Sequence, residues 1–272
     1  MDAVAGHNTP LRLFWWKGVA NFGDALSQIV VAHASGRDVV HSGIGGADLV
    51  AVGSIIQIVR RKFANGGTGR PVIWGSGVLH PTPKDFLEHV DVALVRGPIT
   101  AALLGLKTDQ FGDPGLLIAE ALGEAPQPTD RIGLVPHHKQ VDDPIFARLV
   151  HDHDQVDLID VRADAATVCQ QIARCHHVFA SSLHGLITAD AYGVPSTWAD
   201  PGEESHLKYH DYAASVGRAM IAPIDWDTIP DHLNTLPARG PLSYAAGIKR
   251  AQAALYNSFP VQMRTSTYAG AT

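Results

Sequence analysis

A histidine follows a buried apolar run at the point where strand character changes to helical character. The run 178–180 leads through Ser181 and Ser182 to His184, and an apolar pattern of helical period begins there. This order predicts a parallel strand, a tight turn and a helix. His184 would then lie at the carboxyl edge of a sheet, where α/β proteins bind ligands and a helix start favours an anion. We therefore expect proton transfer on an anionic substrate, and the alternative is a core histidine with an ordinary partner.

Two further charged residues follow predicted strands. Asn21 and Asp24 flank Gly23 where the strand 11–16 gives way to a helix, so Asp24 is expected either to cap that helix or to face a ligand. Arg96 closes an apolar run and precedes a Gly-Pro pair. This predicts a guanidinium free to clamp an anion, with a surface salt bridge as the alternative.

Histidines also follow strands in both halves of the chain. His137, His138 and Lys139 come after the strand 131–136, and His80 comes after a strand that ends in Gly75-Ser76-Gly77. These residues predict a cationic, histidine-rich cleft with the Asp24 carboxylate on its opposite wall.

Motifs for metals and nucleotides are missing from the sequence. The run 151–154, His-Asp-His-Asp, has the composition of a metal cluster, but it lies in a polar connection and is better explained as solvated surface. There is no His-Glu-x-x-His motif, no G-x-G-x-x-G after the first strand and no P-loop. We expect neither a metal nor a bound cofactor.

The order of elements predicts an α/β protein made of two Rossmann-like halves that face each other across a cleft. Short apolar runs alternate with helical patterns over residues 1–122 and again over 131–235. The polar, Pro-containing segment 123–130 is the expected linker. A helix over 243–258 is expected to pack back on the first half, and 259–272 is expected to be disordered.

The composition is that of an ordinary globular protein. Of the 272 residues 46% are hydrophobic and 18% charged, and the net charge of -6 gives no reason to expect a nucleic-acid partner. The chain has two cysteines, and its N-terminus lacks a basic region followed by an apolar one. These features predict a cytoplasmic protein.

Several of these elements together resemble the polysaccharide pyruvyltransferases. They are Asn21-Phe22-Gly23-Asp24, the strand end Val95-Arg96, and Ser182-Leu183-His184-Gly185 followed by Tyr192-Gly193-Val194-Pro195. The opening Phe14-Trp15-Trp16-Lys17 is similar to the ketal-forming members of bacterial exopolysaccharide assembly, including the xanthan enzyme. The resemblance covers most of residues 11–217.

This resemblance implies a GT-B-like fold and phosphoenolpyruvate as co-substrate, with no cofactor. It also implies that His184 and Arg96 engage phosphoenolpyruvate. Some members carry arginine where this chain has Ser182, and Lys139 or Lys208 could supply that charge. The candidate substrate-binding residues are therefore Asn21, Arg96, His137, His138, Lys139, Ser182, Leu183, Gly185 and Lys208.

The implied reaction transfers pyruvate to two hydroxyls of a sugar, forms a ketal and releases phosphate. Phosphoenolpyruvate carries about 3 negative charges at neutral pH, so its site needs cations or helix-start N–H groups. An acid and a base on opposite sides of the donor suffice. We expect a charged His184 to protonate carbon or the departing phosphate and Asp24 to accept the acceptor proton, with His80 as a second candidate for either role.

Two other functions fit the same pattern. A nucleotide-sugar glycosyltransferase of the same architecture would need a carboxylate for the ribose, for which Glu203-Glu204 is a candidate. A non-catalytic sugar- or anion-binding protein would release no phosphate.

The expected acceptor is a lipid-linked oligosaccharide. The apolar and basic run 55–63 could contact the cytoplasmic membrane face, and the alternative is an ordinary helix with a basic end.

Overall fold

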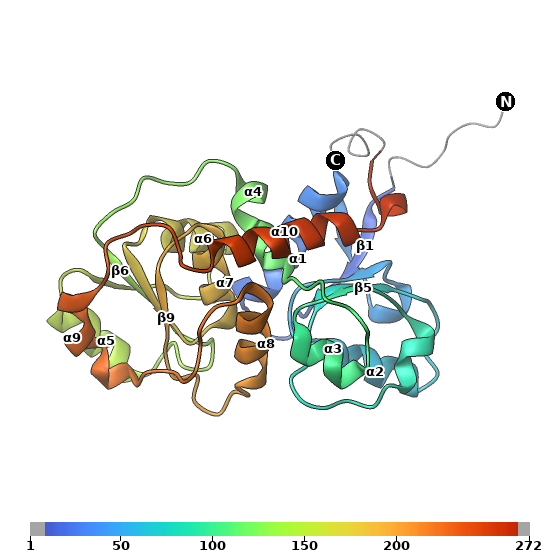
Figure 1. Ribbon diagram of the computed structural model, residues 1–272, viewed down its shortest axis with the longest axis horizontal. Helices are drawn as coiled ribbons and strands as arrows, with labels where there is room; N and C mark the ends of the chain where they lie inside the picture. The colour runs from blue at the N-terminus through green and yellow to red at the C-terminus, as the bar shows by residue number, and fades with distance from the viewer. Residues whose placement is uncertain (1–8, 266–272) are drawn as a thin grey trace.

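Two parallel β-sheets with helices around them make up the computed structural model, which describes residues 9–265 (Figure 1). The first sheet has the strand order β2-β1-β3-β4-β5 and the second β7-β6-β8-β9. Every pairing between neighbouring strands is parallel. The predicted α/β class with parallel sheets is thus confirmed.

The first sheet and its connections occupy the N-terminal part of the chain. In order, the elements are β1 (Leu11–Phe14), α1 (Phe22–Ser35), β2 (Val39–His41), η1 (Ile44–Gly46), β3 (Leu49–Val50), α2 (Ile56–Ala64), β4 (Val72–Ser76), η2 (Asp85–His89), β5 (Asp91–Val95), α3 (Pro98–Leu104), η3 (Pro114–Leu117) and α4 (Ile118–Leu122).

The second sheet and the closing helices follow. They are β6 (Ile132–Val135), α5 (Pro144–Asp152), β7 (Val156–Leu158), α6 (Ala165–Arg174), β8 (His177–Ala180), α7 (Leu183–Ala191), β9 (Ser196–Trp198), α8 (Leu207–Val216), η4 (Trp226–Thr228), α9 (Ile229–His232), η5 (Leu233–Thr235), α10 (Ala245–Ser258) and η6 (Val261–Met263).

The strands that carry the predicted site are the most buried ones. All residues of β4, β6 and β8 are buried, which is why their sequences are apolar without alternation. Helix α7 is buried over its first eight residues, so it lies inside the protein and not on its surface.

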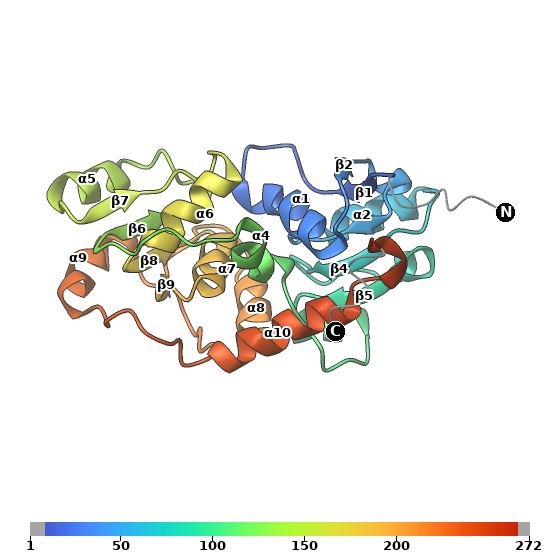
Figure 2. The ribbon, with the colours of Figure 1, turned by 90° about the horizontal axis from the view of Figure 1, so that it is seen from above.

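One hydrophobic core joins the two sheets. The same cluster contains Leu13 of β1, Leu26 of α1, Leu116 of η3 and Leu186 of α7. Figure 2 shows α1 and α4 in the middle of the molecule, between the two sheets. The elements that carry Asn21, Asp24 and His184 are therefore held by shared packing.

Helix α10 runs past both sheets (Figure 1, red). Its start packs against α8, where a side chain on Gly247 would collide with the carbonyl of Val216. Near its end the carbonyl of Leu255 accepts a 3.1 Å hydrogen bond from the indole of Trp74 in β4.

The predicted disorder from residue 259 onward is wrong for residues 259–265. Phe259 is buried and its ring lies edge-on to Trp74, with the ring centroids 4.9 Å apart. The Thr265 N–H donates to the carbonyl of Ser35 at 2.9 Å. An aromatic side chain at the helix end finds a partner that the local sequence does not reveal; residues 266–272 lie outside the described part of the chain.

Among the described helices, none is both long enough and apolar enough to cross a bilayer.

Candidate active site

A pocket of about 260 Å³ lies where segments after β1, β3 and β4 meet segments after β6, β8 and β9. Its lining comes from both sheets. The lining residues are Trp16, Asn21, Asp24, Gly53, Ser54, Ile55, Ile58, Leu79, His137, His138, Ser182, Leu183, His184, Glu204 and Lys208. Its large apolar lining residues are Trp16, which is 44% exposed, Ile55, Ile58, Leu79 and Leu183.

His184 enters the pocket from the first turn of α7. The hydroxyl of Ser182 caps the helix by accepting the Gly185 N–H at 3.2 Å. A side chain on Gly185 would approach Val135 to 2.7 Å, so glycine lets the helix start lie close to β6. The His184 ring packs on Gly23, where an added Cβ would lie 2.3 Å from Nδ1.

Asp24 enters from the first turn of α1. Asn21 caps this helix by accepting the Gly23 N–H, and its amide donates to Asp24 Oδ2 at 2.8 Å. Burial raises the pKa of Asp24 to about 6, although the Asn21 hydrogen bond and the charge of Lys208 act in the opposite direction. The carboxyl therefore titrates close to neutral pH, as an acid–base group would.

Asp24 should make the stability of the protein depend on pH. The pKa of Asp24 in the folded protein lies above its ordinary value of 3.8. Ionisation of Asp24 therefore lowers the free energy of unfolding as the pH rises from 3.8 to 6, and this loss is complete above pH 6 and absent below pH 3.8. We expect Asp24→Asn to raise the free energy of unfolding at pH 8 by roughly 1–3 kcal/mol and to leave it unchanged at pH 3.5. Urea unfolding at the two pH values measures this, and equal destabilisation at both would mean that the carboxylate acts only as a structural partner.

Glu204 organises the charged part of the pocket lining. It accepts hydrogen bonds from Lys139 at 2.7 Å and from Lys208 at 2.9 Å, and His137 Nε2 lies 3.9 Å away. Burial by itself would raise the pKa of Glu204, but the two lysines lower it to about 2. Glu204 is therefore ionised and holds the ammonium of Lys208 at the pocket.

The two histidines after β6 lie side by side, with ring centroids 4.2 Å apart. The His137 N–H donates to the hydroxyl of Ser181 at 2.8 Å, which ties this loop to the end of β8. Burial, with the nearby charge of Lys208, lowers the pKa of His137 to about 4. The imidazole of His137 is thus neutral and can donate or accept a hydrogen bond.

The sequence model of one family, Polysaccharide pyruvyl transferase, matches residues 7–202. The chain belongs to this family. The match includes the segments that contribute Asn21, Asp24, His137 and His184 to the pocket. The predicted family is therefore confirmed.

Two curated proteins are similar over part of their length. The succinoglycan biosynthesis protein ExoV of Rhizobium meliloti is 29% identical over 175 residues, which cover 62% of this chain and 54% of that protein. An uncharacterized protein of Acanthamoeba polyphaga mimivirus is 29% identical over 170 residues, which cover 57% of this chain and 58% of that protein. The chain thus spans a little over half the length of these relatives.

Among solved structures, an uncharacterized protein of Klebsiella pneumoniae is similar with a TM-score of 0.49 and 11% identity. The similarity covers 75% of this chain and 87% of that chain.

In this protein Arg96 does not have the free guanidinium that the sequence predicts. Its side chain is 0% exposed and does not line the pocket. It donates to Asp211 at 3.0 Å, to the Ser54 hydroxyl at 2.6 Å and to the Val78 carbonyl at 3.2 Å. The β5–α3 junction points this side chain into the protein, where α8 supplies a carboxylate from a distant part of the sequence.

Three other predicted site residues lie outside the pocket lining. His80 is exposed and its Nδ1 lies 3.1 Å from the carbonyl of Pro81, although its neighbour Leu79 lines the pocket. The Lys139 side chain is 67% exposed, and Gly185 is buried behind the helix start. The pocket does bring together Asn21, Asp24, His137, His138, Ser182, Leu183, His184 and Lys208.

The charge of His184 differs from the sequence-based expectation. Burial lowers its pKa to about 3, with smaller contributions from the charges of Arg96 and Lys208. The imidazole is therefore neutral near neutral pH, whereas the expectation from sequence is a charged one.

Two carboxylates of the site could not be assigned to it from the sequence. Glu204 is expected there only as a ribose ligand of a glycosyltransferase, and Asp113 stands in a Gly-Asp-Pro-Gly segment that is typical of a turn. Asp113 lies directly behind His184, with Oδ2 3.9 Å from Nε2. The local signal at Asp113 is its place before Pro114, which is typical of a turn or a helix cap and says nothing of His184.

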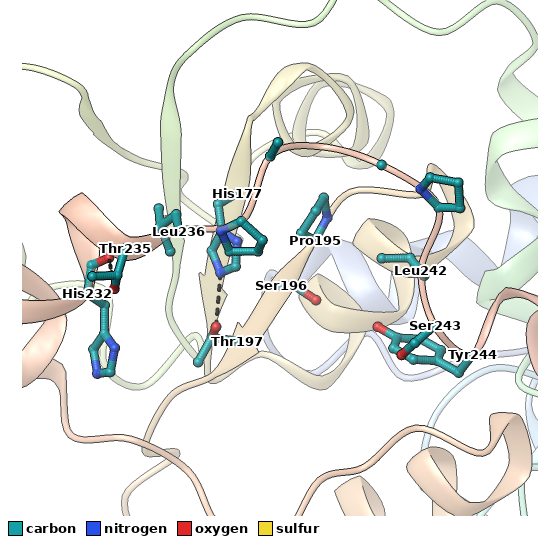
Figure 3. Close-up of a pocket in the computed structure, with 14 residues that line it drawn as sticks. His177, Pro195, Ser196, Thr197, His232, Thr235, Leu236, Leu242, Ser243 and Tyr244 are labelled. Carbon is teal, nitrogen blue, oxygen red and sulfur yellow. Dashed lines mark hydrogen bonds between the residues drawn. The ribbon is translucent and has the colours of Figure 1, made fainter.

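A larger cavity of about 510 Å³ lies at the opposite end of β8 and β9, below the segment 235–243 (Figure 3). His177 and Thr197 line it and share a 2.9 Å hydrogen bond. None of the predicted site residues lines this cavity. Because parallel α/β sheets bind ligands at the carboxyl edge, the smaller pocket is the better candidate.

Proposed function

We propose that the protein transfers pyruvate from phosphoenolpyruvate to two hydroxyls of one sugar in an exopolysaccharide repeat unit. The observation that carries this proposal is one pocket with a lysine, a helix start, an imidazole and a carboxyl of raised pKa. A small dianionic or trianionic donor needs the lysine and the helix start, and ketal formation needs the imidazole and the carboxyl.

The same proposal includes a GT-B-like arrangement, in which the carboxyl edges of the two sheets face each other and hold donor and acceptor between them. Lining residues from loops of both sheets support it.

Protons balance if His184 and Asp24 each act twice. The protonated form of Asp24, which a pKa of about 6 leaves as a minor population at neutral pH, donates to the methylene carbon of the donor. The neutral imidazole takes the proton of the first acceptor hydroxyl as the oxygen of that hydroxyl bonds to the neighbouring carbon. The imidazolium then protonates the departing phosphate, and the Asp24 carboxylate takes the proton of the second hydroxyl as the ring closes. Both residues return to their starting states. This assignment reverses the roles expected from sequence and follows the neutral state of His184 and the raised pKa of Asp24.

Lys208 is the proposed ligand of the donor anion, since it is the one lysine or arginine among the described lining residues. We expect Lys208→Met to raise the Kd of phosphoenolpyruvate about 10- to 100-fold, the loss of one charged hydrogen bond. Calorimetric titration with phosphoenolpyruvate measures this Kd. Lys139→Met is the matched control, because each variant leaves Glu204 with one lysine partner. Equal losses in both variants would contradict a direct role for Lys208.

The acceptor is proposed to be a lipid-linked oligosaccharide whose sugar lies against Trp16 and the other apolar lining residues, because ligand sites combine apolar surfaces with a few polar groups.

Peripheral contact of α2 with anionic lipid belongs to the same proposal. Arg60 pairs with Asp85, so Arg61 and Lys62 are the candidates for lipid contact. Vesicle binding that survives charge reversal at both would contradict that contact.

Phosphate release tests the function directly. We expect release when phosphoenolpyruvate is mixed with a suitable lipid-linked oligosaccharide, and none with either substrate alone. The melting temperature should rise with phosphoenolpyruvate and not with a nucleotide sugar, because a ligand of the native state stabilises it. The opposite preference would favour a glycosyltransferase, and binding without phosphate release from any acceptor would favour an anion-binding protein.

A further inference from the structure

The inner edge of His184 faces a buried carboxylate. His184 Nε2 lies 3.9 Å from Asp113 Oδ2. Both atoms are shut off from solvent, and within residues 9–265 neither has a hydrogen-bond partner. Buried polar atoms rarely stay unpaired, because an unpaired one costs about 1–3 kcal/mol. Two such atoms that face each other point to a contact that forms during the working cycle.

Asp113 is fixed in place independently of His184. Its Oδ1 accepts the Gly115 N–H at 2.9 Å and so caps η3. The preceding Gly112 has no room for a side chain, since a Cβ there would approach the Ala251 carbonyl to 2.9 Å. Because η3 packs on α7, the backbone position of Asp113 directs its second oxygen, Oδ2, towards the imidazole of His184.

The charges around the pair favour one protonation state. Burial raises the pKa of Asp113 to about 6, against the charge of Arg96, and the Asp211 carboxylate adds a smaller increase. Burial lowers the pKa of His184, and Arg96 and Lys208 add to that effect. Above pH 6 the pair is therefore a carboxylate facing a neutral imidazole. A carboxylate can only accept a hydrogen bond, so the imidazole must present N–H to it.

We propose that Asp113 is a positioning residue that holds His184 in the Nε2–H tautomer and leaves Nδ1 as the proton acceptor for the acceptor hydroxyl. Nδ1 lies on the side of Gly23, at the start of the helix that carries Asp24. Since Nε2 is inaccessible, Nδ1 is the nitrogen that can exchange a proton with a molecule in the pocket. A gap of 3.9 Å fits this role, because such hydrogen bonds are often long before substrate binds. The catalytic part of this inference rests on the proposed function.

Asparagine at position 113 gives a test that preserves shape. The amide oxygen can still cap Gly115, while the amide N–H₂ then faces Nε2 and drives the imidazole to the Nδ1–H tautomer. We expect Asp113→Asn to lower kcat by roughly 10²- to 10⁴-fold, the range seen when a histidine base loses its orienting carboxylate, with the KM for phosphoenolpyruvate little changed. The control is Asp143→Asn, because Asp143 also precedes a proline and caps a helix, α5, by accepting the Ile145 N–H at 3.0 Å.

Nitrogen NMR of histidine-labelled protein reads the tautomer without any substrate, and the His184 signal is assigned by its loss in His184→Gln. We expect unprotonated Nδ1 in the unsubstituted protein and in Asp143→Asn, and protonated Nδ1 in Asp113→Asn. Protonated Nδ1 in the unsubstituted protein would overturn the inference even if Asp113→Asn failed to fold. An unchanged kcat in a folded Asp113→Asn would overturn it too. Failure of the unsubstituted protein to release phosphate would count against the proposed function, and the tautomer would still decide the role of Asp113.

Discussion

Replacing His184 by glutamine should lower turnover by about 10²–10⁴-fold, the usual contribution of a general acid or base. Glutamine keeps a polar side chain of similar reach next to Gly23 but cannot take up a proton. Affinity for phosphoenolpyruvate should change much less than turnover, because the proposed anion ligands are Lys208 and the start of α7. A phosphate-release assay with a titration of phosphoenolpyruvate separates the two quantities.

His177 offers the matched control for this substitution. It is a buried histidine at the other end of the same strand–helix unit, and burial lowers its pKa to about 4. Its Nε2 lies 2.9 Å from the Thr197 hydroxyl, and His177 is the first residue of β8, whereas Ser182 and His184 follow the end of that strand. His177→Gln should therefore keep full turnover. Near-normal turnover in His184→Gln, or an equal loss in both variants, would remove His184 from the reaction.

Replacing Asp211 by alanine should destabilise the protein by about 3–5 kcal/mol, because it leaves the Arg96 guanidinium charged, buried and unpaired. Asp211 accepts hydrogen bonds from Arg96 at 3.0 Å and from the backbone and hydroxyl of Thr100 at 2.8 and 2.7 Å. Asp211 is on α8, whereas Arg96 and Thr100 follow β5. The network thus connects the second part of the chain to the first. Denaturant unfolding measures the loss.

A surface pair provides the comparison. Arg131 and Asp157 also form a hydrogen-bonded ion pair, but their side chains are more than a third exposed, and Asp157→Ala should cost no more than about 1 kcal/mol. A similar small loss for Asp211→Ala would contradict the structural role of the buried pair. If Arg96 instead engages the donor, as family resemblance implies, Arg96→Met would abolish phosphoenolpyruvate binding under conditions in which it is still folded.

Local patterns were sufficient to predict the elements that carry the site. The apolar run before Ser181 became β8, the helical pattern after it became α7, and Asn21 caps α1 as its residue type suggests. These features depend on residues adjacent in sequence, and burial makes a parallel strand apolar wherever it lies. The family motifs lie in the same local segments, which is why the family could be named from them.

The partners of each side chain depended on the tertiary structure. Whether Arg96 is free or buried is decided by Asp211, which is 115 residues further along the chain. The sequence makes Lys208 and Lys139 equal candidates for binding the donor anion. In the structure only Lys208 of the two lines the pocket, and its side chain is 10% exposed. Asp113 meets His184 because η3 packs on α7, a contact with no trace in either local pattern.

The sequence by itself determined which backbone segments are strands and helices and which of their ends carry polar groups. Only the tertiary structure decided which of those groups share a pocket, which are buried beneath it and which charges they hold. The physical reason is range: capping and periodicity act within a few residues, whereas desolvation and ion pairing depend on what packs around a group from distant parts of the chain.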